Sequence, residues 1–111
     1  MLSLNKLKTE IMKRYIFASV SATDQISLPA DKILGLDTTD AESLVIHFAG
    51  LGDQDNSGAI DLEIKAGSVK AACRAIVEAI NYSTDPFVVV GDDVNSVYLH
   101  ADIEDVTSIT L

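Results

Sequence analysis

The sequence contains one cysteine, Cys73, no tryptophan, and few aromatic side chains, which make up 5% of its 111 residues. A single cysteine excludes an intrachain disulfide and a cysteine-rich zinc site. Because Cys73 lies in an apolar stripe, we interpret it as part of the core. No apolar run approaches the roughly 18 consecutive residues of a membrane-spanning helix. We therefore expect no transmembrane segment and no membrane partner.

The N-terminus, MLSLNKLKTEIMKRY, has lysines among its leucines. A secretory signal would instead have a basic start, an uninterrupted apolar stretch and a cleavage site with small residues. The sequence therefore predicts a protein that is not secreted by a signal peptide and that stays in a cytoplasm.

Basic residues are scarce outside the N-terminus. The net charge of the chain is −9. Residues 1–14 have a net charge of +3, so the rest of the chain has a net charge of −12. Four Lys and Arg side chains in the acidic body are too few to neutralise a phosphate backbone, so we expect no direct binding of nucleic acid. A basic segment on an acidic body can contact other copies or a partner of opposite charge, although a solvated tail is the simpler interpretation.

Residues 1–13 are predicted to form an arm with the spacing of a helix, and residues 14–111 are predicted to form a single compact domain. Apolar side chains in the arm recur at spacings of three and four, which is typical of a helix. About three turns are marginal for an isolated helix, so we expect the arm to be ordered only against another surface. The interface predicted for the arm consists of Leu4, Leu7, Lys8 and Ile11.

The rest of the chain predicts an α+β fold with an antiparallel sheet of six to seven strands and one packed helix. Within residues 14–111, helical spacing is clear at residues 68–81, with Ser68 as the expected N-cap whose hydroxyl accepts a backbone N–H. Residues 43–49 and 59–65 alternate between apolar and polar side chains, and we interpret them as a hairpin. The other predicted strands are residues 15–20, 26–28, 86–90, 96–101 and 105–111.

The segment GDQDNSGAIDLEI, residues 52–64, matches part of an EF-hand calcium loop. Gly58 fits the position of the sharp turn, but Ile64 stands where the loop needs a bidentate glutamate. The flanking residues alternate as strands instead of repeating as helices, and Asp, Asn, Ser and Gly are common in hairpin loops. We therefore predict a hairpin loop, with a weak calcium site as the alternative. The calcium ligands in that alternative are Asp53, Asp55, Ser57 and Asp61.

Two other patterns are weaker. Gly91-Asp92-Asp93 matches three residues of the metal-binding hairpin of viral RNA polymerases, but two-metal chemistry needs further carboxylates and a large channel. We predict a tight turn there. His47 and His100 fall on predicted strands, and no Cys, Asp or Glu stands at a spacing that would complete a metal site. Because no catalytic constellation is visible, we predict a protein that is not an enzyme and has no cofactor other than the alternative calcium.

The order of segments resembles that of small proteins encoded near the structural genes of marine tailed phages, including phages that infect cyanobacteria. The resemblance covers residues 12–111 and rests on YIFASVSATDQISLPADKILGL, an alternating hairpin with an acidic loop, the helix SVKAACRAIVEAIN and DPFVVVGDDVNSVYLHADI. Through the neighbouring genes, it implies a virion-associated or capsid-decorating role, with capsid or other virion proteins as partners.

Three functions are left, in this order. The first is a structural protein that forms homo-oligomers through its arm, in a virion or the host cytoplasm. The second is a small acidic adaptor or inhibitor that binds a host protein. The third is a calcium-binding module that uses residues 53–61.

Overall fold

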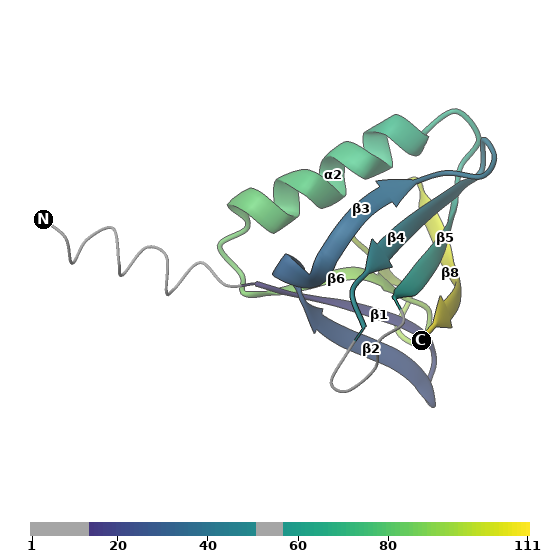
Figure 1. Cartoon of the computed structure of the whole chain (residues 1–111). Helices are drawn as coiled ribbons and strands as arrows, with labels where there is room; N and C mark the ends of the chain where they lie inside the picture. The colour runs from purple at the N-terminus through teal and green to yellow at the C-terminus, as the bar shows by residue number, and fades with distance from the viewer. Residues whose placement is uncertain (1–13, 51–56) are drawn as a thin grey trace, which may run out of the picture.

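The computed structural model describes residues 14–50 and 57–111 and has eight strands in two four-stranded sheets, with one α-helix (Figure 1). The predicted α+β class is confirmed. Sheet A has the strand order β2 (Asp24–Pro29), β1 (Tyr15–Ser21), β6 (Phe87–Asp92) and β7 (Val97–Tyr98). Sheet B has the order β3 (Ile33–Asp37), β4 (Ser43–Phe48), β5 (Gly58–Ile64) and β8 (Ile103–Thr110). The helix is α2 (Val69–Tyr82), and a short 3-10 helix, η1 (Ala30–Lys32), joins β2 to β3.

The prediction of one antiparallel sheet of six to seven strands is wrong in two respects. The described strands form two sheets, and β1 lies parallel to β6 in sheet A. Helix α2 carries the chain back to the end of the molecule where β1 begins, so Tyr15 and Phe87, the first residues of the two strands, are paired. Alternation shows that a segment is a strand, but it does not show which strand lies beside it or in which direction.

Strand β3 was not predicted. It pairs with β4 at the edge of sheet B, with an irregularity between Ile33 and Gly35. Because Leu34 is 67% exposed and Gly35 has no side chain, the segment lacks the apolar alternation of a half-buried strand. The strand predicted at residues 96–101 is shorter than expected and covers only Val97–Tyr98.

The core lies between the two sheets. The predicted hairpin is confirmed, because β4 and β5 are antiparallel and the inward side chains of both strands are almost fully buried. Strand β8 of sheet B lies against β1 and β6 of sheet A, and α2 contacts β4 and β6, one strand of each sheet. The helix therefore packs between the sheets and does not lie across the face of one. The inward residues of the hairpin are Leu44, Ile46, Phe48, Ile60, Leu62 and Ile64.

Helix α2 buries Ala72 and Ile76, in agreement with the predicted apolar stripe. Ser68 occupies the predicted N-cap position, but the expected hydrogen bond from its hydroxyl is wrong, because its side chain makes no hydrogen bond to the first turn. Its backbone has φ −112° and ψ 11°, outside the extended conformation in which a serine hydroxyl caps a helix. No helix in the described parts of the chain is long and apolar enough to cross a membrane.

Arg14 is the first described residue, and it joins the start of sheet A to the end of α2. Its carbonyl oxygen accepts a hydrogen bond from Ala30 N at 2.8 Å. Its side chain is 8% exposed and donates through Nε to Ser83 O at 2.8 Å and through Nη1 to Ile80 O at 3.0 Å. The described chain thus begins beside the C-terminal end of α2. The predicted arm, with Leu4, Leu7, Lys8 and Ile11, lies outside the described residues.

Candidate functional site

The second half of the calcium-like segment is a strand. Asp53 and Asp55 lie outside the described residues, and Ser57 is exposed just before β5. Asp61, on β5, accepts a hydrogen bond at Oδ2 from Ser108 Oγ of β8 at 2.8 Å. Ile64, at the position where an EF-hand needs its bidentate glutamate, is fully buried in the core. Residues 58–64 therefore do not curve around an ion as an EF-hand loop does.

Gly58 has a packing role. A Cβ atom at this position would lie 2.4 Å from Cζ of Phe48 and 2.6 Å from the carbonyl oxygen of Thr110. Among the described glycines, only Gly67 has a positive φ. Gly58 is thus required where the hairpin passes close to the Phe48 ring, and not for the sharp turn of a calcium loop.

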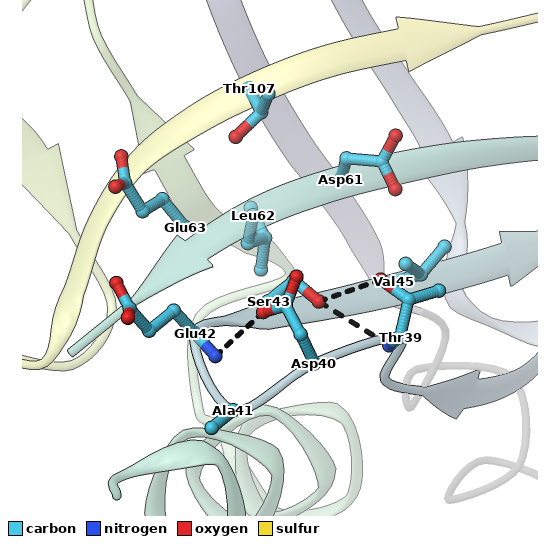
Figure 2. Close-up of a pocket in the computed structure, with 10 residues that line it drawn as sticks. All are labelled: Thr39, Asp40, Ala41, Glu42, Ser43, Val45, Asp61, Leu62, Glu63 and Thr107. Carbon is cyan, nitrogen blue, oxygen red and sulfur yellow. Dashed lines mark hydrogen bonds between the residues drawn. The ribbon is translucent and has the colours of Figure 1, made fainter. Parts of the chain in front are cut away.

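An acidic depression of about 870 Å³ lies on the outer side of sheet B, between the β3–β4 loop and strands β4, β5 and β8 (Figure 2). Figure 2 shows Glu42 and Glu63 on one side of it, with Asp61 farther along β5. We call this the acidic depression. Its lining residues are Thr39, Asp40, Ala41, Glu42, Ser43, Val45, Asp61, Leu62, Glu63 and Thr107.

Acidic side chains face each other across the strands beside the depression. Glu63 on β5 pairs with Asp105 on β8, so two carboxylates face each other across the strands. A hydrogen bond shared with Asp105 raises the pKa of Glu63, and the charges of Asp105, Glu104 and Glu42 raise it further. Like charges at directly opposite positions destabilise a sheet. The facing carboxylates on this side of sheet B therefore lower the stability of the fold.

The β3–β4 loop is held by its own polar side chains. Asp40 Oδ1 accepts a hydrogen bond from Glu42 N at 2.8 Å, and Ser43 Oγ accepts one from Thr39 N at 3.3 Å (Figure 2). Asp40 is thus engaged in the turn, which leaves Glu42, Asp61 and Glu63 as the carboxylates that give the depression its charge.

The Gly91-Asp92-Asp93 sequence also has a structural role. Asp92 Oδ1 accepts hydrogen bonds from the backbone N–H groups of Val94 and Asn95, and Asp92 Oδ2 accepts one from the Asn95 side chain. The bond from the Asn95 side chain lowers the pKa of Asp92, and the two backbone bonds lower it further. Asp93 Oδ1 accepts from Tyr98 Oη at 2.6 Å and from Val106 N at 3.1 Å. The turn predicted at Gly91-Asp92-Asp93 is only partly correct, because Gly91 and Asp92 end strand β6 and the turn covers residues 93–96.

The two histidines lie apart in the fold. His47 on β4 is hydrogen-bonded through Nε2 to Asp37 Oδ1 at 2.8 Å, and both side chains are largely exposed. His100 follows β7, outside any strand, and its Nδ1 accepts a hydrogen bond from Asp102 N at 3.0 Å. Among residues 14–50 and 57–111, no group of three or more His, Cys, Asp or Glu is placed to hold a metal ion.

The outer face of sheet A is aromatic and uncharged at the end where β1 and β6 begin. Phe17 and Phe87 have ring centroids 5.4 Å apart with an interplanar angle of 39°. Pairing in the sheet places two rows of three side chains on this face, and Phe87 is 46% exposed. We call this surface the aromatic face. It consists of Tyr15, Phe17, Ser27, Pro29, Phe87 and Val89.

A third surface is an open groove of about 690 Å³ between α2 and the β3 and β4 strands. Its walls are apolar and its rims are charged on both sides. Leu44 at its base is buried, whereas Val77 on the helix is 43% exposed. We call this the α2 groove. It is lined by Leu36, Asp37, Thr38, Leu44, Val69, Lys70, Cys73, Arg74, Val77 and Glu78.

None of these three surfaces was predicted from the sequence. Each combines residues from elements that are separated in the chain, so only the tertiary fold brings them together. The pairing of Phe17 and Phe87 depends on the parallel contact of β1 and β6, which alternation alone does not reveal. The chain matches no protein-family model, no curated protein and no solved structure.

Proposed function

We propose that this protein is a non-enzymatic structural or interaction protein that acts by self-association, as a component of a phage particle. The observation that carries the proposal is the aromatic face. Phe17, Phe87 and Val89 form an uncharged, partly exposed surface on a domain whose sequence is strongly acidic. Contiguous apolar surface of this kind marks a contact with another protein, because exposing it to water is unfavourable.

The resemblance to small proteins encoded beside phage structural genes supports the virion as the place of this assembly. In a repeated assembly, each copy must offer surfaces that match those of its neighbours. The aromatic face supplies one such surface, and detection of the protein in purified particles tests its place in the virion.

The mass of the purified full-length protein, measured by light scattering over a range of concentrations, tests self-association. We expect an oligomer whose formation is weakened by Phe87→Lys, because the lysine would place a charge in the apolar contact. Val94→Lys is the matched control, since Val94 is 48% exposed and lies outside the aromatic face. A full-length protein that is monomeric at every concentration would contradict the proposal.

The acidic depression supports a second candidate, a small adaptor that binds a basic partner in the host cell. The supporting observation is the pair of opposed carboxylates, Glu63 and Asp105, which the fold retains although they repel each other. This candidate predicts binding of an oligolysine peptide that weakens steeply with salt. The double variant Glu63→Gln and Asp105→Asn should reduce that binding, and equal binding by the variant would exclude the depression as the contact.

A further inference from the structure

We propose that the α2 groove is the receptor for the N-terminal arm, residues 1–13, of a second copy of the chain. This inference rests on the proposed self-association and names the contact through which one copy holds the next. The mode of recognition is that of an amphipathic helix in an apolar groove, in which side chains at spacings of three and four act as anchors.

The shape of the groove suits such a segment. Its helical wall presents Val69, Cys73 and Val77, one on each successive turn of α2, and Val77 stays exposed in the single chain. These three residues span about 12 Å of helix. The groove is open to solvent, so a segment can enter it without any rearrangement of the two sheets.

The arm carries a matching stripe. Leu4, Leu7 and Ile11 fall on one side of a helix, and from first to last they span about 10 Å. The stripe and the wall thus have similar lengths and the same number of anchors. An isolated segment of 13 residues is a marginal helix, so burial of this stripe in the groove would supply the stabilisation that the segment lacks.

Charge favours the same pairing. Residues 1–14 carry +3 and the rest of the chain −12, so each arm is attracted to the body of any copy. The rim of the groove carries two acidic side chains, Asp37 on β3 and Glu78 on α2, together with the basic Lys70 and Arg74. Lys8, on the flank of the arm's stripe, can approach such a carboxylate while the leucines remain in the groove.

Arg14 fixes the point at which the arm joins the domain. Arg14 continues the hydrogen bonding of β1, and its guanidinium is fixed to Ile80 and Ser83 at the C-terminal end of α2. The arm therefore joins the domain beside the C-terminal end of the helix that forms one wall of the groove, and the proposed self-association places it in the groove of a second copy.

Cysteine cross-linking tests this contact, because Cys73 is the only cysteine and stands in the middle of the groove wall. Leu7 is the middle anchor of the stripe, so the two positions meet whichever way the arm runs along the groove. A tagged chain with Leu7→Cys and Cys73→Ser is mixed with the unchanged chain and oxidised with diamide. We expect a mixed disulfide-linked dimer on a non-reducing gel.

The matched control is Thr9→Cys with Cys73→Ser, since Thr9 falls on the opposite side of a helical arm. Equal cross-linking at positions 7 and 9 would overturn the assignment. So would a chain with Leu7→Cys and native Cys73 that closes its disulfide within one molecule, because the arm would then occupy its own groove.

A second variant separates this inference from the proposed function. Val77→Asp should weaken the cross-linked association by about tenfold or more, whereas Val94→Asp should leave it unchanged. If the full-length protein is an oligomer and Val77→Asp does not affect the cross-link, the α2 groove is excluded while self-association is retained. If the full-length protein is a monomer, the proposed function itself is contradicted.

Discussion

Tyr98 donates a hydrogen bond through Oη to Oδ1 of Asp93 at 2.6 Å, across the turn that joins β6 to β7. The same carboxylate accepts the backbone N–H of Val106 on β8, so one aspartate links an edge of sheet A to a strand of sheet B. Because the bond holds the phenol in its protonated form, the adjacent Asp93 raises the pKa of Tyr98 to about 12.

The first prediction concerns the ionisation of this tyrosine. Titration of the tyrosinate absorbance should show one of the three tyrosines ionising at about 12, and Asp93→Asn should move that step toward 10. A tyrosine in the unfolded chain ionises near 10, so the unfolded chain releases its proton first as the pH rises. The contribution of Tyr98 to the free energy of unfolding is therefore complete below pH 10 and is lost between about 10 and 12. Tyr98→Phe, which should lack the late step, is the control.

The second prediction concerns the stability that Asp93 provides. Asp93→Ala leaves both the Tyr98 hydroxyl and the Val106 N–H without an acceptor, and we expect the free energy of unfolding to fall by about 1–3 kcal/mol. Urea denaturation measures the change. Asp24→Ala, at an exposed position, should change stability by less than about 0.5 kcal/mol. Equal effects of the two substitutions would show that Asp93 does not link the sheets.

The third prediction concerns the carboxylates at the acidic depression. Glu63 shares its hydrogen bond with Asp105 best when one of the two is protonated, and its pKa is raised above 4.5. The folded state therefore holds this proton more tightly than the unfolded chain, and stability falls as the pH rises through the raised pKa. Glu63→Gln, whose amide can donate to Asp105 at any pH, should raise the melting temperature at pH 7 and leave it nearly unchanged at pH 3. A variant that is less stable than the native protein at pH 7 would contradict this account.

The fourth prediction compares two glycines of sheet B. Gly58→Ala would place a Cβ atom 2.4 Å from the Phe48 ring and should lower the free energy of unfolding by about 1–3 kcal/mol, as overpacking does. At Gly35, on β3, a Cβ would meet no atom within 4 Å, so Gly35→Ala should be tolerated. Thermal unfolding followed by circular dichroism measures both. If the two variants have the same melting temperature, the close approach of Gly58 to Phe48 does not affect the free energy of unfolding.

The strands and the helix could be predicted from the sequence because their periodicity is local. The helix expected at residues 68–81 is Val69–Tyr82, and the hairpin expected at 43–49 and 59–65 is β4 and β5. Division of the strands into two sheets and the parallel contact of β1 with β6 could not be predicted. Both features depend on where α2 places the start of β6. The alternation of side chains along a strand does not show which strand will pair with it.

The candidate surfaces were less predictable than the fold. Residues 52–64 resemble a calcium loop because side chains that can bind calcium are close together in the sequence. In the structure, residues 58–64 form β5, which directs alternate side chains to opposite faces of the sheet. The α2 groove draws Leu36 and Leu44 from sheet B and Cys73 and Val77 from the helix. In the sequence these residues look like ordinary core positions, and the groove that they line follows only from the placement of α2 against the sheets.

The last prediction concerns calcium, the alternative for the loop that contains Asp53, Asp55, Ser57 and Asp61. Asp61 already accepts a hydrogen bond from Ser108, and the strand at residues 58–64 does not form the second half of an EF-hand loop. We therefore expect the melting temperature to be the same with millimolar calcium and with a chelator. An ion that binds only the folded protein would raise the melting temperature. At a concentration one hundred times the Kd, such binding stabilises the folded protein by about 2.7 kcal/mol. If calcium does raise the melting temperature and the double variant Asp53→Asn and Asp55→Asn abolishes the effect, the loop is a calcium site. In that case light scattering with and without calcium shows whether self-association depends on the ion.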